Sequence, residues 1–121
     1  MVNLAHDATF ELYNLRVEIS ERSGKIIGKH KVGDYFEVIG EDIFFPPNQG
    51  FSLYALSSIL PLLPAKQRVT DKNDWMTSDE YIADPDPHCQ ALYRITRTGK
   101  TPFQRADVTA IPLQPSSLTS L

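Results

Sequence analysis

The most constraining feature of the sequence is a regular alternation of apolar and polar residues between Tyr13 and Ser20. The apolar positions are Tyr13, Leu15, Val17 and Ile19. A period of two is typical of a β-strand with one buried face, because successive side chains of a strand point to opposite sides. The segment therefore predicts a strand, and with it a sheet for that strand to join.

Four further segments have the composition of strands: Tyr35–Ile39, Ile43–Phe45, Glu80–Ala83 and Gln90–Thr98. In the first of them Phe36 and Val38 are expected on the inner face. In the last, Arg94 and Arg97 are expected to face solvent. Ile26 and Ile27 are predicted to form either a short return strand or an apolar plug beneath a loop.

One helix is predicted at Phe51–Leu60. Ser52 can cap it by accepting a hydrogen bond from a free amide of the first turn. Pro61 and Pro64 are expected to end it, because proline lacks the amide proton and clashes with the preceding turn. The apolar residues at helical spacing are Leu53, Leu56 and Ile59 or Leu60. This stripe predicts a helix packed on the sheet.

These elements predict an α+β fold, with a small, largely antiparallel sheet, one short packed helix and an extended C-terminal tail. A compact domain is expected over residues 1–100 and a Pro- and Ser-containing docking tail over residues 101–121. The tail is too apolar for a plain disordered segment and too broken by prolines for a helix. Trp75, within a polar segment, is interpreted as a core plug or a partner anchor. The predicted partner-binding residues are Trp75, Phe103, Ile111 and Leu113.

Composition limits the classes of function. A formal charge of −3 argues against nucleic-acid binding, which needs clustered Lys and Arg. The longest apolar stretch, Phe51–Ala65, is too short and too interrupted to span a bilayer. The single cysteine cannot form an internal disulfide, which fits a reducing compartment, and no signal peptide is recognised. A cytoplasmic protein without nucleic-acid or membrane partners is expected.

The densest group of reactive side chains lies at Asp84–Cys89, with the sequence Asp-Pro-Asp-Pro-His-Cys. Cysteine, histidine and carboxylate groups are zinc ligands, so a zinc site can be drawn from four residues. These are His30, Asp84, His88 and Cys89. Adjacent residues of a strand point to opposite faces, so His88 and Cys89 would need a bend to act together. The alternative interpretation is a rigid proline-rich turn with a buried thiol.

Two other chemistries can be drawn from the same region. A thiol nucleophile at Cys89 would need a nearby base, for which His88, His30 and His6 are the candidates. Acid–base work by Asp34, Asp84 or Asp86 would need burial of these carboxylates. The same aspartates are favoured by turn geometry, and we assign no catalytic or cofactor-binding residue from the sequence.

The segment His30–Val38 resembles the G-x-K-x-G-D-x-F-x-V hairpin of a family of small bacterial proteins. These proteins also have a central helix ending near prolines and a late C-P-D-P stretch. The resemblance spans about Leu12 to Arg97. Where that family commonly has cysteines, this chain has Ile26 or Ile27 and Asp84. The resemblance therefore implies that a metal site built on those cysteines is lost or altered here, with Cys89 remaining.

The wider layout resembles the smallest subunit of acetophenone carboxylase and its relatives, through Phe45–Pro47, the Asp74–Met76 loop and the tail. This resemblance implies a complex that carboxylates an aromatic ketone with bicarbonate, ATP and a divalent metal, with catalysis on larger hydantoinase-like subunits. The expected function is thus a non-catalytic accessory subunit. The alternatives are a small metal-binding or thiol-dependent enzyme centred on the four residues above, or a free-standing ligand-binding domain.

Overall fold

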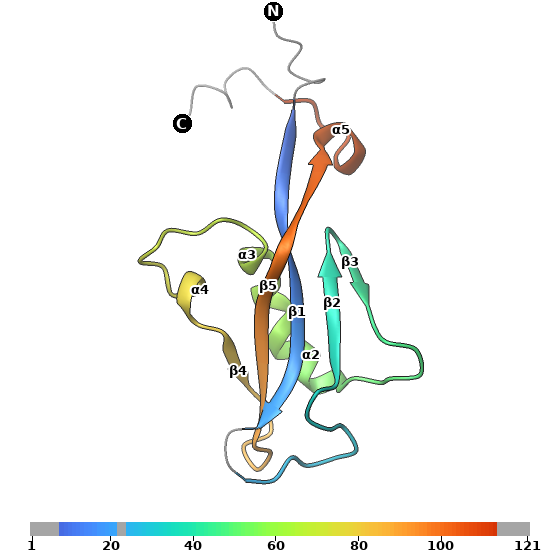
Figure 1. The fold of residues 1–121 in the computed structure, drawn as a ribbon, viewed down its shortest axis with the longest axis vertical. Coiled ribbons are helices and arrows are strands. Elements are labelled where there is room, and N and C mark those ends of the chain that lie inside the picture. The colour runs from blue at the N-terminus through green and yellow to red at the C-terminus, as the bar shows by residue number, and fades with distance from the viewer. Residues whose placement is uncertain (1–7, 22–23, 114–121) are drawn as a thin grey trace, which may run out of the picture.

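One antiparallel sheet organises the chain (Figure 1). The computed structural model describes residues 8–21 and 24–113. Within these ranges the sheet has five strands in the order β3-β2-β1-β5-β4. The strands are β1 (Thr9–Glu21), β2 (Tyr35–Ile39), β3 (Asp42–Phe44), β4 (Tyr81–Ala83) and β5 (Ala91–Gln104). The α+β fold and the antiparallel sheet are as the sequence predicts.

The two longest strands, β1 and β5, pair along their whole length and lie at the centre of the sheet. Their far ends extend beyond the other strands as a two-stranded ribbon (Figure 1). Between Asn14 and Leu15 the partner changes from Gly99 to Arg97, which leaves Thr98 as an extra residue in β5. Such a bulge bends the bulged strand and increases its twist.

The boundary predicted after residue 100 falls inside β5. Thr101–Gln104 pair with the beginning of β1 and belong to the sheet. The short helix α5 (Arg105–Val108) follows directly. β5 pairs with β1 on both sides of the bulge at Thr98 and so continues to Gln104. This pairing is a tertiary effect that the local sequence does not reveal. Residues 114–121 of the predicted tail lie outside the described residues.

A helical layer of three consecutive segments lies across one face of the sheet (Figure 1). They are α2 (Leu53–Ile59), the 3₁₀ segment η1 (Leu60–Leu62) and α3 (Leu63–Lys66). The predicted cap is confirmed, because the Ser52 hydroxyl oxygen accepts from the Ala55 amide at 3.2 Å. The α-helix α2 ends at Ile59, just before Pro61, as predicted, but the chain then continues as η1 and α3, which the sequence did not predict. Each proline lies in the first turn of the next helical segment, where no intrahelical amide is required.

The buried face of the helical layer agrees with the predicted stripe at Leu56 and Ile59 but not at Leu53. Leu53 is 75% exposed, whereas Ala55, Ile59 and Leu63 are buried. The layer packs on the strand residues that alternate inward, which are Leu15, Val17, Ile19, Phe36, Val38, Ala91, Tyr93 and Ile95. Phe51 packs edge-to-face on Phe36, with ring centroids 5.0 Å apart. The inner faces predicted for β1 and β2 are therefore confirmed.

Candidate functional site

The segment Asp84–Cys89 is a turn whose backbone is held by its own aspartates. Oδ1 of Asp84 accepts from the Asp86 amide at 2.8 Å, and Oδ1 of Asp86 accepts from the His88 amide at 2.9 Å. The Cys89 amide donates to the Asp86 carbonyl at 3.0 Å. These are two successive turns of the kind that aspartate favours, in a segment already restricted by two prolines. The geometry supports the interpretation as a rigid turn.

The same turn is fixed to the sheet through Tyr93. The Tyr93 hydroxyl on β5 donates to Oδ2 of Asp84, which thus has both carboxylate oxygens engaged. Burial, reinforced by the hydrogen bond to Asp84, raises the pKa of Tyr93 well above its ordinary value. The sequence placed Tyr93 in a strand, but nothing in it signalled that its hydroxyl meets a residue in the preceding turn.

Cys89 is half-buried and packs against the core. Its Sγ accepts from the amide of Ile27 at 3.3 Å, across the loop that follows β1. Ile26 packs on the core beside it, whereas Ile27 is exposed, so the plug interpretation holds for Ile26 alone. The segment around these two isoleucines has no strand conformation. The thiol therefore helps to hold this loop to the core.

The four predicted zinc ligands lie in different surroundings. Asp84 and Cys89 line one hollow of about 400 Å³ together with Ile27 and Tyr54. His30 lines a separate hollow beside Asp34, and its ring packs on Phe51 with centroids 6.5 Å apart. His88 is exposed on the turn. Among the described residues, no three His, Cys, Asp or Glu side chains are grouped so that they could hold a metal ion.

Trp75 is presented on a short, well-anchored helix. It begins α4 (Trp75–Ser78), and Oδ1 of Asp74 caps this helix by accepting from the Met76 amide at 2.9 Å. The Trp75 side chain is 68% exposed, so the interpretation as a core plug is wrong. The sheet is covered instead by the helical layer, through Ala55, Ile59 and Leu63.

Lys66 supports α4 from beneath. This residue is only 5% exposed, and its Nζ donates to the Met76 carbonyl at 2.6 Å and to the Asp79 carbonyl. Burial, with the nearby Arg97 charge, lowers the pKa of Lys66, and the charges of Asp79, Glu80 and Asp74 oppose that shift. Sequence reasoning missed this residue, because a lysine at the start of a polar segment is ordinarily solvated.

Arg97 holds the other side of the same segment. Its Nε donates to the Lys66 carbonyl and its Nη2 to the Arg68 carbonyl, both at 2.8 Å. The guanidinium carbon lies 4.4 Å from the centre of the Tyr13 ring. The prediction that Arg97 faces solvent is wrong, because the carbonyls at the end of α3 need donors and this strand position supplies them. The segment that carries Trp75 is therefore fixed to the sheet on both sides.

The predicted docking residues of the tail occupy two places. The Phe103 ring on β5 packs on Phe10, with centroids 5.7 Å apart, and covers Gly40 so closely that a Cβ there would lie 2.9 Å from it. Ile111 is exposed and Leu113 is half-buried, and both line a hollow beside α5. Arg105 holds this end of the chain by donating from Nη2 to the Ile111 carbonyl at 3.1 Å.

A largely apolar groove of about 510 Å³ lies between the ribbon, the β2–β3 turn and the helical layer. Its apolar lining includes Phe10, Leu12, Ile39, Leu60, Leu63 and Phe103. No single stretch of sequence predicts this groove, because its walls come from segments far apart in the chain. Its volume exceeds that of the hollow at Asp84 and Cys89 and that of the hollow beside α5, so it is a candidate site for the ligand-binding alternative.

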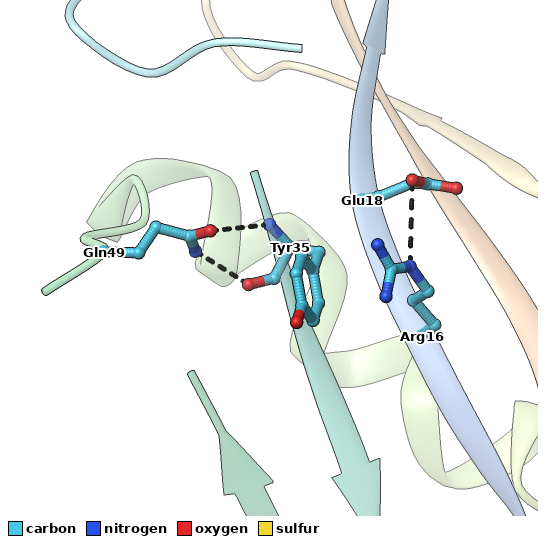
Figure 2. Close-up of polar contacts among 4 residues, drawn as sticks. All are labelled: Arg16, Glu18, Tyr35 and Gln49. Carbon is cyan, nitrogen blue, oxygen red and sulfur yellow. Dashed lines mark hydrogen bonds and ion pairs between the residues drawn. The ribbon is translucent and has the colours of Figure 1, made fainter. Parts of the chain in front are cut away.

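Polar side chains contact Tyr35 at the start of β2. Figure 2 shows Gln49 bridging the backbone of Tyr35, with its Oε1 accepting from the amide at 3.2 Å and its Nε2 donating to the carbonyl at 2.7 Å. The Arg16 guanidinium carbon lies 3.7 Å from the centre of the Tyr35 ring, and Nε of Arg16 is 3.8 Å from Glu18 Oε2 (Figure 2). These contacts are partly exposed and screened by solvent, so they contribute little to stability. They hold Tyr35, the first residue of β2, in position.

Comparisons with known proteins add no family to these observations. No family model matches the chain, and no curated protein or solved structure matches it either. Within the described ranges, no helix has the length and apolar character that crossing a membrane demands. The resemblance to the small subunit of ketone carboxylases thus stays a prediction.

Proposed function

We propose that this chain is a non-catalytic accessory subunit that docks on larger partner proteins. The observation that supports the proposal is Trp75, an exposed aromatic residue on a support fixed from two sides by Lys66 and Arg97. Tryptophan is enriched among residues that dominate binding energy, and a rigid support lowers the entropy lost on binding. An exposed tryptophan on an anchored helix is thus suited to fill a pocket on a partner.

The partners that the sequence resemblance implies are the hydantoinase-like large subunits of an ATP-dependent ketone carboxylase. On this proposal ATP, bicarbonate and the divalent metal bind to those subunits, in a cytoplasmic complex. Ile111 and Leu113 supply a second contact near α5, and the Asp84–Cys89 turn shapes a third. Phe103 contributes by holding the ribbon against Gly40, since its ring is already used within the chain.

Co-expression of the chain with the proteins encoded beside its gene tests this proposal. A stable complex on size-exclusion chromatography is expected, and the purified large subunits should lose ketone carboxylation when this chain is left out. Trp75→Ala should weaken the complex about 30-fold, as for a typical anchor residue. Val69→Ala, at an exposed apolar site on the same segment, is the matched control and should change the affinity less than about threefold.

If the chain forms no complex with any of these proteins, that result contradicts the proposal. So does a complex that forms equally well with Trp75→Ala, because the anchor would then have no role in docking. Loss of binding in both variants would point to general damage, so both are first compared with the wild type by far-ultraviolet circular dichroism. Docking is attributed to Trp75 only if Trp75→Ala loses binding and Val69→Ala does not.

The second candidate function is a small thiol-dependent or metal-binding enzyme. The observation in its favour is that Asp84, Asp86 and Cys89 share one hollow with Ser52, Tyr54 and Ser57. Asp84 and Cys89 already accept hydrogen bonds from Tyr93 and Ile27, which a reaction at this place would have to replace. We therefore favour docking as the function.

A further inference from the structure

One edge of the sheet is strongly apolar. Strand β3 is the outermost strand on its side among the described residues (Figure 1). It presents Ile43 and Phe44, and Phe45 follows directly after it, with exposed fractions of 40, 52 and 43%. The Phe45 ring also packs on Phe36 and Phe51. The opposite edge strand, β4, also has three residues and is flanked by the acidic Glu80 and Asp84. An exposed apolar edge strand is a template for pairing with another strand, because one side of its backbone is unpaired.

The hairpin geometry defines which backbone groups are free. Gly40 and Glu41 form a two-residue turn with φ of 61° at Gly40, and the flanking pair Ile39–Asp42 is hydrogen-bonded in such hairpins. Bonded and non-bonded pairs alternate along an antiparallel ladder. The pair Val38–Ile43 is therefore non-bonded, and the amide and carbonyl of Ile43 point away from β2. We extend the alternation by one residue past the end of β3, which directs the amide and carbonyl of Phe45 outward.

We propose that two copies of this chain pair antiparallel through β3 and join their sheets into one. The outward groups of Ile43 bond those of Phe45 of the second copy, and the reciprocal pair follows by the twofold symmetry. Phe44 then faces Phe44 of the second copy across a non-bonded pair, where side chains approach most closely. This register covers all three exposed apolar residues of the edge.

The charges and prolines at the ends of β3 fit this register. Asp42 stands opposite Pro46 of the second copy, so the acidic residues of the two copies lie at opposite ends of the paired segment. Like charges directly opposite each other would destabilise a sheet, and here none face. Pro46 has no amide hydrogen, but the register needs none there. The backbone nitrogen of residue 46 faces β2 of its own chain and not the second copy. Pro47, whose amide would be needed next, ends the pairing.

Sedimentation velocity of the full chain at about 10 μM to 1 mM tests the pairing, since a short interface predicts weak association. The wild-type mass should rise from 13.6 kDa toward twice that value with concentration. Phe44→Lys places a charge on the edge and should keep the chain at 13.6 kDa. Val69→Lys, at an exposed site away from β3, is the control and should associate like the wild type. A wild type that stays monomeric to 1 mM, or an unaffected Phe44→Lys, overturns the proposal.

Oxidative cross-linking tests the register independently of the fold of the lysine variant. In a Cys89→Ser background, glutathione disulfide should oxidise two thiols of Phe44→Cys to an interchain disulfide, itself being reduced to two glutathione molecules. The close approach of a non-bonded pair suits disulfide geometry. Tyr54→Cys, exposed on α2, is the control for random collision and should cross-link at least about tenfold more slowly. Equal rates for the two variants overturn the register.

Discussion

Replacing Lys66 by methionine tests the role of the buried ammonium group beneath α4. Methionine keeps the length and the apolar stem of lysine, so it removes the donor with little change in packing. The Met76 and Asp79 carbonyls then lose their charge-assisted hydrogen bonds. Each such bond contributes about 1.5–3 kcal/mol, and the cost of burying the ammonium offsets part of the sum. We expect the free energy of unfolding to fall by about 2–4 kcal/mol.

Urea unfolding followed by circular dichroism measures this change. Trp75 is the only tryptophan, so its fluorescence reports directly on the segment that Lys66 supports. Arg94→Met is the matched control, because its side chain is 42% exposed and its ion pair with the similarly exposed Glu80 is screened by solvent, so its loss should change the free energy of unfolding little. If Lys66→Met unfolds within about 0.5 kcal/mol of the wild type, the two carbonyls do not depend on this donor.

The pH dependence of the free energy of unfolding gives a second test of whether the Lys66 ammonium group is buried. Burial lowers the pKa of Lys66 below the ordinary lysine value of 10.5. The unfolded chain therefore binds the proton more tightly, and this group makes stability rise as the pH approaches 10.5. The difference between the wild type and Lys66→Met should grow over that window. A difference that shrinks there would show that the lysine is not desolvated in the folded chain.

Three further outcomes are expected. Tyr93→Phe should cost about 1–3 kcal/mol at neutral pH through the lost bond to Asp84. Because the pKa of Tyr93 is raised in the folded chain, wild-type stability should fall as the pH rises above 10, and the Phe variant should fall less in urea titrations. Gly40→Val should lower the melting temperature through its positive φ and its contact with Phe103, and Gly28→Val, with open space around it, should lower it less. Elemental analysis of the purified chain should find zinc below about 0.1 per chain, and a stoichiometric metal lost on Cys89→Ser would instead favour the metal-site alternative.

The parts of the fold that could be predicted are those with a local physical cause. The alternation in β1 sets which face is buried whatever the strand pairs with, and Ser52 caps the helix through a neighbouring amide. The parts that could not be predicted depend on residues distant in the sequence. Leu53 has helical spacing but is exposed, and Ala55 is buried in its place, whereas Ile59 is buried as predicted. The helical layer continues past Pro61, because the 3₁₀ segment η1 begins at Leu60 and has this proline in its first turn.

The candidate site depends even more on residues that are distant in the sequence. The sequence grouped Asp84, His88 and Cys89 by nearness along the chain, and the structure directs them to different neighbours. Lys66 was missed because burial of a charge is decided by which carbonyls lie above it, here those of Met76 and Asp79. Trp75 was singled out by residue type alone, and only the structure shows that its support is fixed.

The central pairing of β1 with β5 has a consequence for how the chain folds. It joins residues such as Ile19 and Tyr93, from opposite ends of the sequence, so most native contacts of the sheet centre are non-local. Non-local pairing slows folding, because a long loop must close before the contacts form. During synthesis β1 can pair with β2 early, but its other edge stays unpaired until β5 has been made. That unpaired edge of β1 is open to mispairing in the newly made chain.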